Sequence, residues 1–272
     1  MDEAFLVAAP SLEAVFYGAG SIRAIAPPEF WRRGIVICSA WGANAVPVAE
    51  YALSQILFGL KRGWQAAAAM KAARGKAQSR QILDGVSGAY GGVVGIVSLG
   101  MIGRLVVEKL KPFDVRILAY DPYVAEAEAR GLGVELAGLD DLFRQADVVS
   151  LHAPWLPETV GLIRGAHFAA MKPYATFINT ARGAIVREEE MIETLGRRGD
   201  VWAVLDVTHP EPPVPDSPLW TLPNVTLTPH MAGSQGAECH RMGQTMLEEL
   251  DRYLSGAPLR WQVTEEKARI MA

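Results

Sequence analysis

Short apolar runs alternate with amphipathic segments along most of the chain, a pattern that predicts alternating β-strands and α-helices. The predicted strands lie within 12–17, 34–39, 93–97, 115–120, 148–154, 175–183, 201–207 and 225–230. Runs without an exposed polar face are typical of strands buried on both sides of a parallel sheet. The pattern therefore predicts an α/β fold with a doubly wound parallel sheet.

Two longer segments have the spacing of helices. In 46–73 and in 236–254 apolar residues recur at every fourth position, and Pro47 suits the first turn of the earlier helix. The tail from Pro258 onward mixes charged and apolar residues without a period, so we expect it to be partly unordered.

The strand over 93–97 runs into a turn that follows the pattern G-x-G-x-x-G, except that Ser98 stands at its first position. Gly100 and Gly103 occupy the second and third positions. Glycine lets backbone N–H groups approach a pyrophosphate at the positive end of the following helix. The turn, together with its strand and helix, predicts a dinucleotide site, and a purely structural turn is the alternative.

An acidic residue, Asp121, ends the next predicted strand. A carboxylate at this position can accept the ribose hydroxyls of adenosine and would repel a 2′-phosphate, which favours NAD over NADP. The cofactor-binding residues predicted in this corner are Ser98, Gly100, Met101, Ile102, Gly103 and Asp121.

Composition narrows the expected partners and compartment. The 272 residues suffice for two modest domains or one large one, and 50% of them are hydrophobic. The net charge of −4 predicts no basic surface for nucleic acid or membrane. Cys38 and Cys239 are far apart, which predicts neither a disulfide framework nor a zinc site. The acidic N-terminus does not resemble a signal peptide. We expect a cytoplasmic protein that binds a small molecule and no metal.

Polar side chains follow several predicted strands, where a parallel sheet binds its ligands. Arg182 could bind a carboxylate with two hydrogen bonds, although a surface arginine in a loop is the alternative. His230 could transfer a proton near neutral pH, and Glu211 could support it from a proline-rich loop or be an ordinary solvated carboxylate. His209 is the alternative to His230 as the group that transfers the proton. His167 and His240 fall in helical patterns and are expected to be structural.

Several motifs together resemble the D-isomer-specific 2-hydroxyacid dehydrogenase family. They are FYGAG, VAEYAL, GIVSLGMIG, LHAP, MKPYATFINTARGAIV, VLDVTHPEPP and LPNVTLTPHMAGS, and they occur in family order over almost the whole chain. The resemblance implies an NAD-dependent oxidoreductase that interconverts a 2-oxo acid and a D-2-hydroxy acid. A related fold serves as a corepressor, so a non-catalytic NAD sensor is the alternative.

The resemblance also assigns roles to residues. It implies that Arg182 binds substrate and that His230 is the acid and base, oriented by Glu211. The amides of Gly18, Ala19 and Gly20 would hold the substrate carboxylate. Asp206 would meet the nicotinamide carboxamide, and the backbone of Thr180 and Ala181 would line the same pocket. His152 would lie beside the cofactor without a role in the chemistry.

The sequence departs from the family at three places. Ser98 and Tyr174 stand where glycine is common. The GAG part of FYGAG begins at residue 18, although in the family two βα units precede this loop. The resemblance thus implies a smaller, discontinuous, flavodoxin-like substrate domain that lacks its first βα units. An upstream start, or a truncated and inactive form, would explain such a gap.

The expected organisation is a Rossmann-type NAD-binding domain inserted into that substrate domain. The predicted NAD-binding domain is 65–235, and the substrate domain comprises 1–64 and 236–272. The family commonly dimerises through its cofactor domain, and the weakly polar segment 64–89 is the candidate contact of a homodimer.

Overall fold

A computed structural model describes residues 1–23 and 25–271 and divides them into two compact units. Unit 1 comprises Met1–Pro47 and Gly233–Ala272, and unit 2 comprises Val48–Ala232. The predicted boundaries, after residues 64 and 235, differ from this division. The first boundary lies after Pro47 and not after residue 64, because the helix between these positions buries Ala52, Ile56 and Leu60 in the core of unit 2.

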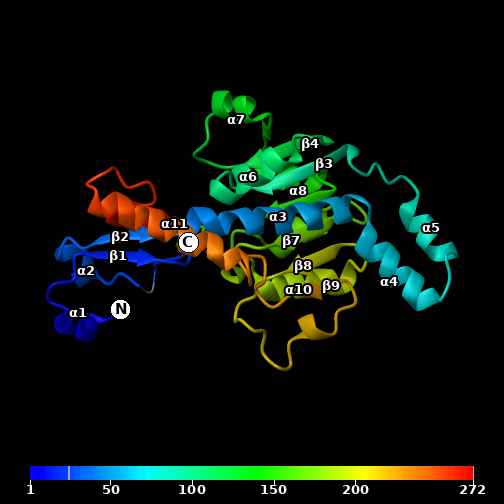
Figure 1. The fold of residues 1–272 in the computed structure, drawn as a ribbon. Helices are drawn as coiled ribbons and strands as arrows, with labels where there is room; N and C mark the ends of the chain where they lie inside the picture. Colours follow the sequence, from blue (N-terminus) through cyan, green and yellow to red (C-terminus); the bar gives the residue numbers. More distant parts are fainter. Residues whose placement is uncertain (24, 272) are drawn as a thin grey trace. The chain divides into compact units, whose positions relative to one another are not determined.

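Unit 2 is built on a seven-stranded sheet in which all paired strands are parallel (Figure 1). Its order is β5-β4-β3-β6-β7-β8-β9. The strands are β3 (Tyr90–Val97), β4 (Asp114–Tyr120), β5 (Glu135–Leu136), β6 (Val148–Leu151), β7 (Thr176–Asn179), β8 (Trp202–Leu205) and β9 (Val225–Leu227). The order reverses between β3 and β6, which is the point where such sheets bind ligands. This architecture confirms the predicted Rossmann-type α/β fold.

Two apolar cores cover the two faces of this sheet, because successive side chains of a strand point to opposite sides. Val149 and Phe177 belong to one core, and their neighbours Val148 and Ile178 belong to the other. The helices and 3-10 turns that follow the strands are α6 (Met101–Leu110), α7 (Glu126–Leu132), α8 (Leu139–Gln145), α9 (Gly165–Ala170), η1 (Gly183–Ile185), α10 (Glu188–Arg197) and η2 (Pro218–Trp220).

The helix predicted over 46–73 is two helices, α3 (Trp41–Leu60) and α4 (Gly63–Ala73), so the prediction was wrong at its start and in its middle. Pro47 lies inside α3, not in its first turn. A proline usually favours a helix start, but here the helix begins at Trp41, and Ala43 and Ala45 of its first turns are buried. Arg62 adopts a left-handed φ of 51° and ends the helical run. A short helix, α5 (Ala77–Leu83), follows α4.

Unit 1 combines both ends of the chain around a two-stranded parallel sheet. Its elements are α1 (Glu3–Ala8), β1 (Ala14–Tyr17), α2 (Pro28–Arg32), β2 (Val36–Ser39), the start of α3, α11 (Glu238–Leu254) and α12 (Glu265–Ile270). The tail expected to be partly unordered is largely folded, because Val263 is only 1% exposed and packs with Leu6, Phe30 and Ile37. Residue 272 lies outside the described residues.

None of the helices in the described ranges combines the length and the apolar composition that a bilayer-crossing helix requires.

Candidate active site

The turn that contains Ser98, Gly100 and Gly103, which we call the glycine corner, joins β3 to α6 in the predicted strand–turn–helix order. Ser98 takes the first glycine position with a left-handed φ of 77°, which explains why glycine is favoured there. A Cβ on Gly103 would lie 2.1 Å from the Ser98 carbonyl oxygen, so this position has no room for a side chain. The corner is therefore tight, as the motif predicts.

Asp121 follows β4 and supports the same corner. Its Oδ2 atom accepts hydrogen bonds from the Leu99 amide at 2.8 Å and from Ser98 Oγ at 3.4 Å, and its Oδ1 atom accepts one from the Tyr123 amide at 2.9 Å. The carboxylate thus fixes the turn. Its predicted contact with a ribose remains a prediction.

Several features of unit 2 fit NAD. A Cβ on Gly100 would meet nothing closer than Ser98 Oγ at 3.9 Å, and Gly100, as the N-cap of α6, has no side chain that could cover the first amides of the helix. The approach to the first amides of α6 is thus open to a pyrophosphate. Within the described residues, the buried atoms His152 Nδ1 and Thr180 Oγ1 have no hydrogen-bond partner. They follow the neighbouring strands β6 and β7, where a ligand could satisfy them.

His152 is a neutral group in the folded protein. Its side chain is buried, and its Nε2 atom lies 2.9 Å from Ser150 Oγ. Burial lowers the pKa of His152 from 6.5 to about 4. This imidazole can donate or accept a hydrogen bond, but it does not carry charge near neutral pH.

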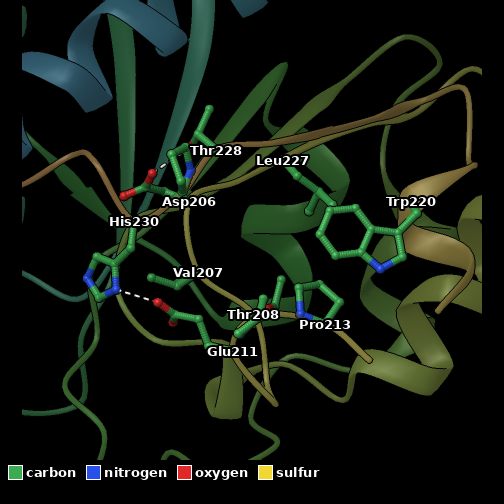
Figure 2. Close-up of a pocket in the computed structure, with 11 residues that line it drawn as sticks. Asp206, Val207, Thr208, Glu211, Pro213, Trp220, Leu227, Thr228 and His230 are labelled. Atoms are coloured by element: carbon green, nitrogen blue, oxygen red, sulfur yellow. Dashed lines mark hydrogen bonds and ion pairs between the residues drawn. The ribbon is translucent and has the colours of Figure 1, made fainter. Parts of the chain in front are cut away.

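His230 and Glu211 form a hydrogen-bonded pair. His230 follows β9 and Glu211 lies in the loop after β8, and His230 Nδ1 is 2.6 Å from Glu211 Oε1 (Figure 2). The two side chains are 48% and 40% exposed, so a substrate could reach the imidazole. A carboxylate on Nδ1 fixes the tautomer and leaves Nε2 for a ligand.

Asp206 holds the segment that carries His230. Its Oδ1 atom accepts hydrogen bonds from Thr228 Oγ1 at 2.6 Å and from the Met231 amide at 2.8 Å, and its Oδ2 atom accepts one from the Ala232 amide at 2.8 Å. Asp206 is 2% exposed. The sequence pattern did not reveal this supporting role. The predicted contact of Asp206 with a nicotinamide remains a prediction.

Arg182, Asp206 and His230 follow β7, β8 and β9, which are consecutive in the sheet. Arg182 is half-buried and its Nη1 atom donates to the Ala181 carbonyl at 2.7 Å. A Cβ on the next residue, Gly183, would lie 2.0 Å from the carbonyl carbon of Thr208, so the two loops are in tight contact. The predicted role of Arg182 remains a prediction.

Asn179 orders the turn that leads to Arg182. Its Oδ1 atom accepts from the Ala181 amide at 3.0 Å, and its Nδ2 atom donates to the Arg182 carbonyl at 3.1 Å. We did not predict this role, although an asparagine at the end of a buried strand is a recognisable turn signal.

His230 and Glu211 border a cavity of about 400 Å³. The lining residues are Asp206, Val207, Thr208, Glu211, Pro212, Pro213, Trp220, Leu227, Thr228, Pro229 and His230. Figure 2 shows that Trp220 and Pro213 line the side opposite His230. The cavity has mostly apolar walls beside the hydrogen-bonded His230 and Glu211.

The other histidines lie away from this pair, and His167 and His209 make contacts that suit structural roles. His167 Nδ1 accepts from the Arg164 amide at 2.9 Å at the start of α9, and His240 lies in α11. The ring of His209 is 5.8 Å from that of Trp155, and its amide donates to Glu188 at 3.0 Å. His209 therefore anchors the loop that carries Glu211.

The predicted substrate loop, Gly18–Gly20, lies in unit 1 after β1. Ser39 Oγ, at the end of β2, lies 2.8 Å from the Ala19 carbonyl oxygen and also within hydrogen-bond distance of the Gly20 carbonyl. Ser39 therefore fixes the loop. Binding of a substrate carboxylate by its amides remains a prediction.

The parallel sheet, the glycine corner and Asp121 define a dinucleotide-binding α/β protein. Residues 53–232 match the sequence model of the D-isomer specific 2-hydroxyacid dehydrogenase NAD binding domain. The chain belongs to this family, and its cofactor is NAD.

Curated relatives with similar sequences belong to the same class of dehydrogenases. The chain is 35% identical to the D-3-phosphoglycerate dehydrogenase of Archaeoglobus fulgidus over 84% of this chain and 43% of the relative. It is 32% identical to the glyoxylate reductase of Korarchaeum cryptofilum over 94% of this chain and 77% of the relative. The chain spans about half the length of the phosphoglycerate dehydrogenases that it matches.

Solved structures share the fold. The TT0316 protein of Thermus thermophilus superimposes with a TM-score of 0.77 at 31% identity, covering 95% of this chain and 81% of the other. The apo form of Rhodotorula graminis D-mandelate dehydrogenase gives a TM-score of 0.73 at 29% identity, covering 87% and 70%.

Proposed function

We propose that this chain is an NAD-dependent oxidoreductase that interconverts a 2-oxo acid and a D-2-hydroxy acid. The observation that carries the proposal is the contact of His230 Nδ1 with Glu211 Oε1 at 2.6 Å. An imidazole oriented by a carboxylate, beside a cavity at the carboxyl edge of a parallel sheet, suits general acid–base catalysis. Membership of the family supports the same chemistry.

The proposal assigns a role to each site residue. NADH, when bound, supplies the hydride. During reduction His230 donates a proton to the carbonyl oxygen of the 2-oxo acid, and it removes that proton during oxidation. Glu211 accepts the Nδ1–H hydrogen bond, which fixes the tautomer and the orientation of the imidazole. Arg182 binds the substrate carboxylate and polarises the carbonyl.

The test is NADH consumption with glyoxylate, hydroxypyruvate and phenylpyruvate, and NAD reduction with D-3-phosphoglycerate. In Arg182→Ala and His230→Ala we expect turnover to fall about a hundredfold or more, while the Kd for NADH stays near that of the unchanged protein. His240→Ala is the control, because His240 is exposed on α11.

Two results would contradict the proposal. If the unchanged protein binds NADH but turns over none of these acids, a non-catalytic NAD sensor becomes the better explanation. If both variants lose NADH binding as strongly as turnover, Arg182 and His230 do not have the assigned roles.

We further propose a homodimer in which residues 64–89 form the contact. α4 and α5 extend away from the sheet of unit 2 (Figure 1). Met70 is 49% exposed and Leu83 is 46% exposed, so this segment offers apolar side chains to a second copy. The cytoplasmic location remains a prediction.

A further inference from the structure

The backbone at His230 is held in a conformation that an L-residue seldom adopts. Its φ of 52° is left-handed, and its amide donates to the Asp206 carbonyl at 3.1 Å and to the Thr228 carbonyl at 3.0 Å. The Asp206 carboxylate also accepts the two amides that follow His230. The direction of the imidazole therefore depends on how firmly Asp206 is held.

A third donor to Asp206 extends this network to α3. Thr228 Oγ1 donates to Asp206 Oδ1 at 2.6 Å, because an ionised carboxylate can only accept (Figure 2). The single hydroxyl proton of Thr228 is thereby used, so the contact of Tyr51 Oη with Thr228 Oγ1 at 3.1 Å has Tyr51 as its donor. The order of donation is thus Tyr51 to Thr228 to Asp206.

Tyr51 is suited to act as a permanent donor. It is half-buried in α3, in the part that belongs to unit 2. Burial raises the pKa of Tyr51 above its usual value of 10, and the charge of Asp206 raises it further, while the Thr228 contact has a smaller lowering effect than burial. The phenol therefore stays protonated throughout the working pH range.

We propose that Tyr51 is a positioning residue for His230, which it orients through the hydroxyl of Thr228 and the carboxylate of Asp206. The inference rests on the proposed function only for the acid–base role of His230. Without the phenol, Thr228 Oγ1 loses the donor that fixes its rotamer, so Asp206 and the left-handed turn at His230 are held less firmly. A small displacement of a catalytic acid lowers the rate of the chemical step more than it lowers cofactor binding.

The test is Tyr51→Phe, which removes only the hydroxyl group. We expect kcat for 2-oxo acid reduction to fall about tenfold, with KM for NADH within about twofold of the unchanged value. Tyr90→Phe is the matched control, because Tyr90 is 80% exposed. Thr228→Ser keeps the hydroxyl and should restore most of the activity that Thr228→Val loses.

A double-mutant cycle tests the route of the effect. If Tyr51 acts through Thr228, Tyr51→Phe has no further effect on kcat in a Thr228→Val background. If the two losses multiply instead, Tyr51 does not act through Thr228 and the inference is overturned.

A spectroscopic measurement separates this inference from the proposed function. In ¹⁵N-histidine-labelled protein, the Nδ1 proton of His230 gives a hydrogen-bonded resonance, which is assigned by its absence in His230→Asn. We expect Tyr51→Phe to shift or broaden this resonance and Tyr90→Phe to leave it unchanged, whether or not the protein turns over a substrate. An unchanged resonance, or an unchanged kcat in a protein that is active, would refute the role of Tyr51.

Discussion

At the scale of single residues, two positions keep a backbone conformation that glycine adopts more easily than other residues. The two departures from glycine noted in the sequence, Ser98 and Tyr174, both have left-handed backbones, with φ of 77° and 63°. Glycine is therefore favoured at both positions because it adopts a left-handed φ without strain. Ser98 and Tyr174 adopt the same conformation at a cost in backbone strain. The sequence could indicate such positions only through the family pattern.

Gly183 gives the clearest prediction at this scale. A Cβ there would lie 2.0 Å from the carbonyl carbon of Thr208, so Gly183→Ala must push apart the two loops that carry Arg182 and Glu211. We expect the free energy of unfolding to fall by about 1–3 kcal/mol and turnover to fall as well. Urea unfolding measures the first effect.

The matched control is Gly196→Ala. Gly196 lies in α10 and its added Cβ would meet nothing within 4 Å, so the substitution should stabilise the helix by up to about 1 kcal/mol. Equal stability changes in the two variants would show that the contact of Gly183 with Thr208 is not tight.

At the scale of elements, the strands could be predicted because each is a buried apolar run. The predicted helix over 46–73 was wrong because its pattern is continuous, whereas the break at Arg62 depends on tertiary contacts. Arg62 Nη1 donates to the carbonyls of Ile82 at 2.8 Å and Asp84 at 3.0 Å, and these contacts hold the left-handed turn. No periodicity in the sequence reports contacts between residues that far apart.

The pair α4 and α5 leads to a prediction about assembly. If this segment forms the homodimer contact, Met70→Glu together with Leu83→Glu places charge in an apolar interface and favours the monomer. Sedimentation velocity should show a dimer for the unchanged protein and a monomer for this variant. Val160→Glu is the control, because Val160 is 54% exposed outside the segment; dissociation by the control alone would place the interface elsewhere.

At the scale of the whole molecule, the chain builds one unit from a continuous segment and the other from its two ends. Unit 2 is the continuous segment Val48–Ala232, so the order of strands and helices along the sequence predicts its sheet. Unit 1 joins β1 and β2 to α11 and α12, so the order of the tail depends on apolar contacts with the N-terminal part. The predicted partly unordered tail was wrong for that reason.

Acid stability of the molecule should depend on His152. The folded state keeps this imidazole neutral, with a pKa of about 4, while the unfolded chain protonates it below about pH 6.5. The unfolded state therefore binds more protons between these values, so stability is lost as pH falls from about 6.5 to 4. This group alone accounts for up to about 3 kcal/mol.

Urea unfolding at several pH values tests this expectation. His152→Asn should reduce the slope of stability against pH in this interval. A slope that is unchanged in His152→Asn would mean that the imidazole is not buried as described.

The sequence by itself determined the α/β fold, the glycine corner and the candidate residues Arg182, Glu211 and His230, because buried strands and tight turns impose local patterns on composition. The tertiary structure decided how these residues are supported. The 2.6 Å contact of Glu211 with His230, and the hydrogen bonds that Asp206 makes around it, join segments that only the parallel sheet brings together. Such contacts leave no periodic signal, since they depend on the pairing of strands and not on spacing along the chain.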